Sequence, residues 1–176
     1  MKNTKLFILF LLTAILFLSC SSNLTKTSLS NFDEILSKFH NPTSNKILIA
    51  AHRAMHTKYP ENSLAAFQHS IDFGIDIIET DFRTTKDGKI VLLHDDSVDR
   101  TTNGKGKVKD FTFAQLQKME LVKTDGDTNT YRIPLAEDAF NLARGKIIID
   151  LDIKDVSIKD LVNLVHKTNV EKQVLF

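Results

Sequence analysis

The sequence predicts an α/β fold in which parallel strands alternate with helices, either an α/β barrel or a doubly wound sheet. From residue 47 onward, short apolar segments alternate with segments of helical periodicity, which is the order expected for βαβ units. The first apolar segment, 47–51, has no polar alternation, as expected for a strand covered on both faces. With 176 residues, 42% of them hydrophobic and 26% charged, the composition is that of one globular domain.

The first twenty residues predict an export signal rather than part of that domain. Lys2 and Lys5 precede an apolar run over 6–18, which is shorter than the roughly 20 residues needed to span a bilayer. Cys20, the only cysteine, follows at once, so the segment resembles a bacterial lipoprotein signal whose cysteine is acylated. We expect a membrane-anchored lipoprotein that faces the periplasm or the cell exterior. A cleaved secretory signal with an incidental cysteine is the alternative.

Residues 21–44 are rich in Ser, Thr, Asn and Lys and predict a tether with one short amphipathic helix. The apolar side chains of that helix are Phe32, Ile35, Leu36 and Phe39. The folded domain then covers 45–176. The net charge of the chain is +1 and no basic face dominates, so we expect no nucleic-acid partner.

Within the domain the pattern alternates between strands, helices and polar loops. The expected strands are 47–51, 75–82, 89–93, 146–154 and 173–176. The expected helices are 64–73, 112–121, 135–143 and 158–167. The expected loops are 95–109 and 124–130.

Capping and turn residues mark several of these boundaries. Asn62-Ser63 can cap the helix that follows it, and Gly74 can end that helix. Asp87-Gly88 is the turn signal of a hairpin that leads into the strand expected at 89–93. Gly145 ends the helix before the third main strand.

Polar side chains collect where the main predicted strands end. Strand by strand they are His52-Arg53, Glu79-Thr80-Asp81 and Asp150-Leu151-Asp152-Ile153-Lys154. Strand side chains alternate between faces, so Glu79 and Asp81 point the same way. The carboxyl ends of parallel barrel strands open onto one rim, where active sites are built. Several carboxylates gathered there form an oxygen cage suited to Ca²⁺ or Mg²⁺ rather than Zn²⁺.

Each of these features also has an ordinary structural explanation. A Glu-X-Asp at a strand end is often a loop-facing polar pair or a helix cap, and a single histidine such as His52 is often only a well-paired residue. The segment 150–154 has the alternation of an edge strand. However, an Asp and a Lys that point inward are costly to bury unless they are paired or bound to metal. The coincidence at three successive strand ends therefore favours a site.

Seven short motifs then follow one another along the domain. They are His52-Arg53, Pro60-Glu61-Asn62-Ser63-Leu64-Ala65-Ala66-Phe67, Ile78-Glu79-Thr80-Asp81, Thr85-Lys86-Asp87-Gly88, His94-Asp95, Asp99-Arg100-Thr101-Thr102-Asn103-Gly104 and Asp152-Ile153-Lys154. Their order and spacing resemble the glycerophosphodiester phosphodiesterase family over nearly all of 47–176. Any one motif is weakly specific, whereas the ordered set is strongly so. The resemblance implies a TIM-type (β/α) barrel that hydrolyses glycerophosphodiesters, which are small molecules, to glycerol 3-phosphate and an alcohol.

The resemblance also implies one divalent metal ion, held by Glu79, Asp81 and Asp152. Asp152 stands where the family has glutamate, so its carboxylate is shorter by one carbon–carbon bond. Ca²⁺ tolerates irregular coordination better than Mg²⁺, and we therefore expect Ca²⁺. Ala54 stands where glycine usually follows the His-Arg motif, a mild change if the backbone there keeps φ negative.

By the same resemblance, His52 and His94 are the acid–base pair, while Arg53 and Lys154 bind the phosphate. These residue types suit the reaction, because cations must neutralise the charge that develops on an anionic phosphodiester. Histidine, with a reference pKa near ~6.5, can take or give a proton near neutral pH.

The number of predicted strands is small for a barrel, which takes ~250 residues or roughly 200 at the least. We therefore expect about the first half of a barrel, truncated at its carboxyl end. Two other functions stay open at this point. One is a related phospholipid head-group phosphodiesterase or lyase, and the other is a catalytically inactive barrel fragment that acts as a binding protein.

Overall fold

The computed structural model describes residues 31–123 and 126–176. The predicted signal at 1–20, with Cys20, and the first part of the predicted tether lie outside the described residues. The short helix expected at the end of the tether is α2, Asn31–His40. Among the helices of the described ranges, none is both long enough and apolar enough to cross a membrane.

The strands of the described residues form one sheet with a parallel core. In chain order they are β1 Ala50–Ala51, β2 Ile77–Thr84, β3 Ile90–Leu92, β4 Ile148–Ile153 and β5 Val174–Leu175. The spatial order is β1-β2-β4-β5, and each neighbouring pair in that order is parallel. β3 folds back on the end of β2 as an antiparallel hairpin, as the Asp87-Gly88 turn predicts. The parallel α/β arrangement expected from the sequence is confirmed.

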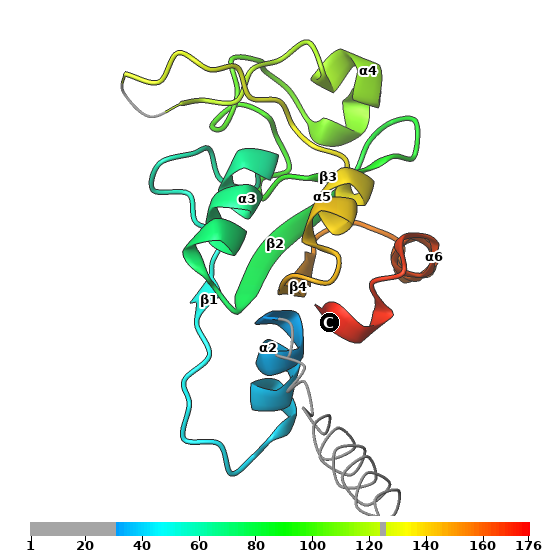
Figure 1. Cartoon of the computed structure of the whole chain (residues 1–176). Coiled ribbons are helices and arrows are strands. Elements are labelled where there is room, and N and C mark those ends of the chain that lie inside the picture. Colours follow the sequence, from blue (N-terminus) through cyan, green and yellow to red (C-terminus); the bar gives the residue numbers. More distant parts are fainter. Residues whose placement is uncertain (1–30, 124–125) are drawn as a thin grey trace, which may run out of the picture.

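The helices lie around this sheet in the order that βαβ units produce. After α2 they are α3 Leu64–Phe73, α4 Phe113–Leu116, α5 Ala136–Ala143 and α6 Ile158–Thr168, with short 3-10 turns at Val108–Asp110 and Glu171–Gln173. Figure 1 shows α2 at the end of the sheet opposite to the segment that carries α4. α3 and α5 pack against each other, and their apolar side chains share one core with β2 and β4.

Alternation along β2 and β4 separates an apolar face from a charged one. Ile78, Phe82, Ile149 and Leu151 are buried in the main core together with side chains of α3, α5 and α6. The ring centroids of Phe82 and Phe140 lie 5.6 Å apart in that core. The residues between them, which include the predicted metal ligands, therefore project from the opposite face. The buried core thus fixes which side of the sheet carries the chemistry.

The stretch between β3 and α5 is more ordered than a loop prediction implies. It has its own apolar cluster, made of Val91, Leu93, Val98, Val108, Leu116, Leu121 and Ile133. The helix expected at 112–121 is shorter, because α4 ends at Leu116. The backbone N–H groups of Leu121 and Val122 bond to the carbonyls of Tyr131 and Thr101 instead of continuing the helix. We call residues 94–123 and 126–134 the excursion; they pack around this small apolar cluster.

The strand expected at 47–51 is also shorter than predicted, with only Ala50 and Ala51 in the sheet. Ile47 and Ile49 are exposed, so the expectation of a strand covered on both faces is wrong for this segment. Ile49 is held by Asp76 instead. Its N–H donates to the Asp76 carboxylate over 3.0 Å, and its carbonyl accepts from the Asp76 N–H over 3.2 Å. The same carbonyl also accepts from the Ile77 N–H over 3.1 Å, so the pairing with β2 begins at this point.

The turn that follows β1 adopts left-handed backbone conformations. Arg53 has φ 55°, Ala54 φ 61° and Asn62 φ 55°. Alanine in place of glycine was expected to be a mild change at position 54 if φ stayed negative. Because φ is positive there, that condition is not met. A left-handed conformation costs an L-residue with a side chain about 1–2 kcal/mol. The Ala54 methyl group is nevertheless buried in the main core, which offsets part of that cost.

We predict that Ala54→Gly changes the free energy of unfolding by less than about 1 kcal/mol. Relief of the left-handed strain, about 1–2 kcal/mol, offsets a lost methyl contact of ~0.8 kcal/mol and glycine's extra chain entropy of roughly 0.5–1 kcal/mol. The matched control is Ala66→Gly in α3, where alanine is equally buried but helical. Without strain to relieve, the control loses about 1.5 kcal/mol or more. Urea unfolding measures both, and equal losses in the two variants would contradict the strain at Ala54.

Candidate active site

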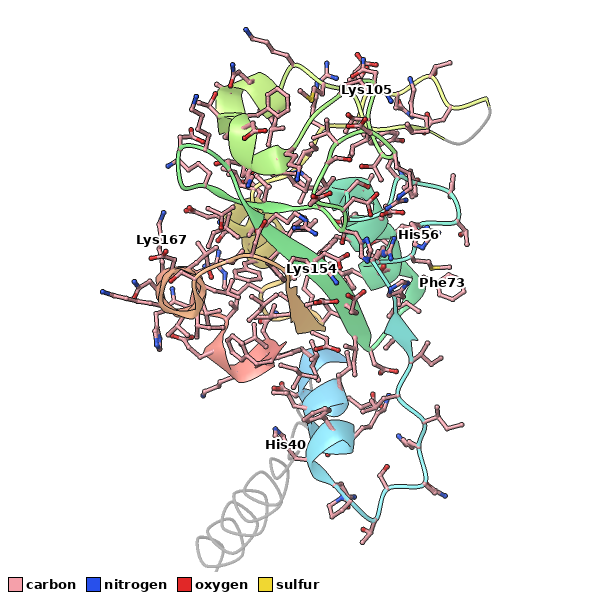
Figure 2. The ribbon with its side chains drawn as sticks, turned by 180° about the vertical axis from the view of Figure 1, so that it is seen from behind. His40, His56, Phe73, Lys105, Lys154 and Lys167 are labelled. Atoms are coloured by element: carbon pink, nitrogen blue, oxygen red, sulfur yellow. The ribbon has the colours of Figure 1, made fainter. Side chains whose placement is uncertain are left out.

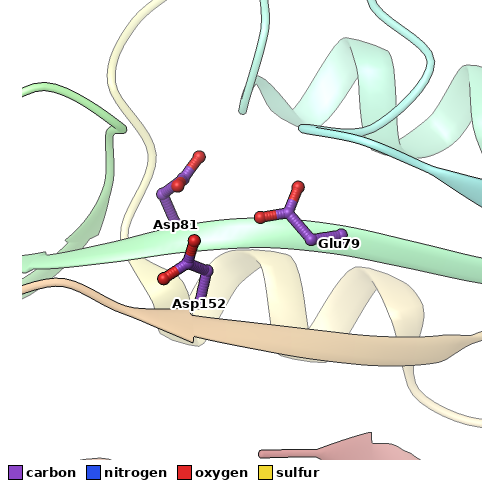
Figure 3. A group of neighbouring side chains, drawn as sticks. All are labelled: Glu79, Asp81 and Asp152. Carbon is purple, nitrogen blue, oxygen red and sulfur yellow. The ribbon is translucent and has the colours of Figure 1, made fainter.

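Three carboxylates gather on the charged face of the sheet. β2 and β4 pair in a register that sets Asp81 beside Asp152, with Glu79 two residues earlier on β2. One oxygen from each carboxylate can be chosen so that all three lie within 4.8 Å of one another. Figure 3 shows the three side chains on the same side of the two strands. The structure thus brings together the metal ligands expected from the sequence.

Asp81 is fully buried, and one of its oxygens has a dedicated partner. Asn62 donates its side-chain amide to Asp81 Oδ2 over 2.8 Å. The amide oxygen of Asn62 accepts from the Thr80 hydroxyl over 2.6 Å, which fixes the orientation of the amide. The other oxygen, Asp81 Oδ1, is buried and accepts no hydrogen bond from the residues that the structure describes. A buried carboxylate oxygen without a hydrogen bond is costly unless a cation lies beside it.

Asn62 was expected to help cap the following helix, but its side chain is used in the site instead. Ser63 alone provides the cap, since its hydroxyl accepts from the Ala66 N–H. The N–H of Asn62 donates to the Arg53 carbonyl over 3.0 Å, which closes the turn after β1. The link from Asn62 to Asp81 is therefore a feature that the capping pattern did not indicate.

Lys154 places an ammonium group between two of the carboxylates. Its Nζ lies 2.5 Å from Asp152 Oδ2 and 3.2 Å from Asp81 Oδ1. The second contact is an ion pair. The hydrogen bond to Asp152 raises the pKa of Lys154, and Asp81 adds to the effect. Figure 2 shows Lys154 over the sheet, well away from the labelled surface lysines Lys105 and Lys167.

Glu79 is bound to the turn that follows β1. Its Oε2 accepts from the Arg53 N–H over 2.8 Å and lies 3.9 Å from His52 Nε2. Burial raises the pKa of Glu79, the Arg53 N–H lowers it, and the negative charge of Asp81 raises it again. The net shift of the Glu79 pKa is upward, so a nearby positive charge would stabilise the ionised form of this carboxylate.

The donor set fits a hard divalent cation. Each ligand atom is a carboxylate oxygen, the type that Ca²⁺ and Mg²⁺ prefer. Lys154 lies beside Asp81, yet Asp81 Oδ1 accepts no hydrogen bond from the described residues and the pKa of Glu79 is raised. One ammonium group therefore does not balance the three carboxylates. An acidic cluster that could hold one metal ion is therefore present among the described residues.

Arg53 lies beside this cluster. Its Nη1 donates to Glu61 Oε1 over 3.1 Å, and its Nε lies 3.8 Å from Asp81 Oδ2 without a hydrogen bond. The side chain is largely buried, with 17% of it exposed, so its guanidinium is held in one place. A buried N–H group that faces the carboxylates without a partner is suited to an anionic ligand.

His94 follows β3 and is fixed at both its ring and its backbone. Its Nδ1 lies 2.7 Å from Asp95 Oδ1. An ionised carboxylate only accepts hydrogen bonds, so Nδ1 carries the proton and Nε2 is left for other chemistry. The carbonyl of His94 accepts from Arg83 Nε over 3.0 Å and from Arg83 Nη2 over 2.6 Å. A hydrogen bond from Arg100 and then one from His94 hold the pKa of Asp95 well below its usual range.

His52, in contrast, is an exposed residue. Its side chain is 68% accessible, and its contact with Glu79 at 3.9 Å is too long for a hydrogen bond. It directly follows Ala51, which pairs with Ile78, the residue before Glu79, so it lies at the same end of the sheet as the carboxylates. The ring is therefore free to reorient toward a ligand at the rim.

The sequence motifs contained further residues of the site without indicating what they do. Glu61, Asn62, Asp95 and Arg100 belong to motifs that were recognised from their order along the chain, yet no role followed from that order. The side chains of Glu61, Asn62 and Asp95 each contact a predicted site residue. Arg100 contacts Glu61 and Asp95. The motif positions were the only signal for them, because hydrogen bonds between distant loops leave no periodicity in a sequence.

Comparisons with known proteins agree with this geometry. Residues 52–175 match the model of the glycerophosphoryl diester phosphodiesterase family. A glycerophosphodiester phosphodiesterase of Caldanaerobacter subterraneus subsp. tengcongensis is 36% identical over 138 residues, which cover 74% of this chain and 57% of that protein. The chain spans about half the length of the curated relatives that it matches.

Solved structures give the same result. A glycerophosphoryl diester phosphodiesterase from Parabacteroides distasonis superposes with a TM-score of 0.73 at 40% identity, over 84% of this chain and 52% of that one. An Oleispira antarctica phosphodiesterase in complex with the product sn-glycerol-3-phosphate has a TM-score of 0.59 at 26% identity, over 72% of this chain and 51% of that one. The parallel α/β arrangement described above is thus part of a TIM-type barrel. The chain belongs to the glycerophosphoryl diester phosphodiesterase family.

Proposed function

We propose that this protein hydrolyses glycerophosphodiesters to glycerol 3-phosphate and an alcohol. The observation that carries the proposal is the cluster of Glu79, Asp81 and Asp152, with Lys154 and Arg53 beside it. Such a site combines anionic metal ligands with basic side chains, which is what an anionic phosphodiester requires. The complex of the Oleispira relative with sn-glycerol-3-phosphate supports the same class of substrate.

The proposed metal is Ca²⁺, bound by Glu79, Asp81 and Asp152. Ca²⁺ takes oxygen ligands at roughly 2.3–2.6 Å in flexible geometry, so it can join oxygens up to about 5 Å apart. The three carboxylate oxygens lie within 4.8 Å of one another, which suits that span. The bound cation would polarise a phosphoryl oxygen and help to neutralise the charge that develops there.

Arg53 and Lys154 are the proposed phosphate-binding residues. Arg53 has a buried Nε–H that finds no hydrogen-bond partner within the described part of the chain and lies 3.8 Å from Asp81 Oδ2. Lys154 neutralises Asp81 and Asp152, and a divalent cation bound by those carboxylates would take over that task. The ammonium group would then be free to contact a phosphate oxygen.

His52 and His94 are the proposed proton-transfer residues. During hydrolysis an attacking oxygen loses a proton as it bonds to phosphorus, and the departing alcohol oxygen gains one as its bond to phosphorus breaks. Asp95 keeps the Nδ1 proton of His94 in place, which leaves Nε2 of that ring to take or give the transferred proton. His52, on the neighbouring turn, is exposed and can serve the opposite step.

We predict that Glu79→Ala and Asp81→Asn abolish Ca²⁺ binding measured by isothermal titration calorimetry, because each removes a negatively charged ligand. Asp152→Glu should bind at least as well as the parent, since Asp152 is partly exposed and leaves room for a longer side chain. Glu137→Gln is the control, because it removes a surface ion pair with Lys167 on the helical side of the sheet. Unchanged Ca²⁺ affinity in Glu79→Ala would rule out this site.

We predict that the protein releases glycerol 3-phosphate from a panel of glycerophosphodiesters with Ca²⁺ and that EDTA stops the release. His52→Ala and His94→Ala should each lower kcat by roughly 10²–10⁴-fold while Ca²⁺ binding persists. His166→Ala, an exposed histidine paired with Glu171, is the control and should keep full activity. A cyclic phosphate product would indicate a lyase instead, and Ca²⁺ binding without any turnover would indicate a binding protein.

We also propose that the protein is exported and held at a membrane by acyl chains on Cys20. The support is the order of charged, apolar and cysteine residues in the first twenty positions. One acyl chain gives only marginal membrane binding, whereas several chains hold a protein firmly.

Fractionation of cells that express the protein tests this anchor. We predict that Cys20→Ala moves the protein from the membrane fraction to the soluble one or leaves it unprocessed, whereas Ser21→Ala stays with the membrane. The lipoprotein assignment fails if the parent and Cys20→Ala are equally soluble.

A further inference from the structure

Arg100, in the excursion, joins two carboxylates that belong to different parts of the site. Its Nη1 and Nη2 donate to Glu61 Oε2 and Oε1 over 2.9 and 2.8 Å. Its Nε and Nη2 also donate to Asp95 Oδ2 and Oδ1 over 2.7 and 3.0 Å. One guanidinium thus makes two paired contacts, which is the geometry in which arginine binds carboxylates most strongly.

Each of the two carboxylates has its second partner in the proposed catalytic machinery. Glu61 also accepts from Arg53 Nη1 over 3.1 Å. Asp95 also accepts from His94 Nδ1 over 2.7 Å. The result is a continuous chain of charged hydrogen bonds from Arg53 through Glu61, Arg100 and Asp95 to His94. This chain links the turn after β1 to the segment after β3.

We propose that Arg100 is a positioning residue that fixes the phosphate-binding Arg53 and the proton-transferring His94 relative to each other. The inference rests on the proposed function for the roles of those two residues, and on the observed hydrogen bonds for the link between them. Arg100 contacts neither the three clustered carboxylates nor Lys154 through any of its described bonds. Its effect is therefore expected on turnover, with metal binding unchanged.

The electrostatics of the chain favour this positioning role. Burial alone would raise the pKa of Glu61, but the hydrogen bond and charge of Arg100, followed by the charge of Arg53, hold that pKa below its ordinary value. Both carboxylates thus stay ionised and act only as acceptors. Arg100 is itself 48% exposed, so solvent screens its contacts and they contribute little to stability. Lysine cannot replace it, because one ammonium cannot make paired bonds to two carboxylates.

Kinetics of Arg100→Met and Arg100→Lys in the Ca²⁺-loaded protein test the proposal. We expect kcat to fall roughly 10–100-fold in both variants, as for other residues that orient catalytic groups, and KM to rise because Arg53 is less well placed. Ca²⁺ affinity and the urea midpoint should stay near the parent values. Lys107→Met is the control, since it removes another ion pair of the excursion, with Asp96, that does not reach the site. Full activity in Arg100→Met and Arg100→Lys would overturn the proposal.

A double mutant separates a positioning role from a general structural one. If Arg100 acts through His94, Arg100→Met adds less loss in kcat/KM to His94→Ala than it causes alone. Losses that multiply would show that Arg100 acts independently of His94.

An NMR readout needs no turnover and so stays informative even if the protein hydrolyses no glycerophosphodiester. The nitrogen shifts of His94 in the parent should report a proton fixed on Nδ1, and Arg100→Met should show a mixture of the two ring tautomers. A His94 ring that keeps its Nδ1 proton fully in Arg100→Met would contradict the coupling, whatever the activity. Absence of turnover in the parent together with a mixed tautomer in Arg100→Met would retain the coupling and reject the proposed reaction.

Discussion

The gathering of like charges on one face of two paired strands is the constraint on which the site depends. The parallel register sets Asp81 beside Asp152, and Glu79 joins them from the same strand. Three carboxylates this close repel one another unless positive charge is supplied. Lys154 supplies part of it, and the turn after β1 adds a backbone N–H at Glu79. The opposite, apolar face of the two strands packs against the helices, and this burial fixes the register that keeps the three carboxylates on the charged face.

The excursion and the turn after β1 can be understood as the supports of this charged face. The excursion has its own apolar core, so it can hold Arg100 at a defined place above the sheet. The turn accepts the cost of left-handed residues at Arg53 and Ala54, and it thereby directs the Arg53 N–H at Glu79. The strained turn and the excursion both depart from regular βαβ geometry. Both lie where the functional groups must be placed.

The sequence predicted the main strands and the clustered carboxylates. The features that it did not predict depend on contacts between residues far apart in the chain. Apolar runs and period-2 alternation located β2 and β4 and placed Glu79, Asp81 and Asp152 on one face, because those signals are local. The short β1 was overestimated because apolar composition does not reveal that Asp76 binds the backbone of Ile49. The helix before Leu121 was overestimated for the same kind of reason, since its backbone pairs with a distant loop. The roles of Asn62 and Arg100 depend on contacts across 19 and 39 residues, which no pattern of residues along the chain encodes.

A crystal structure of the protein with Ca²⁺, located by its anomalous scattering, tests the central claim most directly. The claim is that the carboxylates on β2 and β4 form a metal site whose charge Lys154 balances in the absence of metal. We expect one ion bound to oxygens of Glu79, Asp81 and Asp152 at about 2.3–2.6 Å, with the Lys154 ammonium moved away from Asp81. An ion bound elsewhere, with Lys154 still paired to both Asp81 and Asp152, would contradict the account.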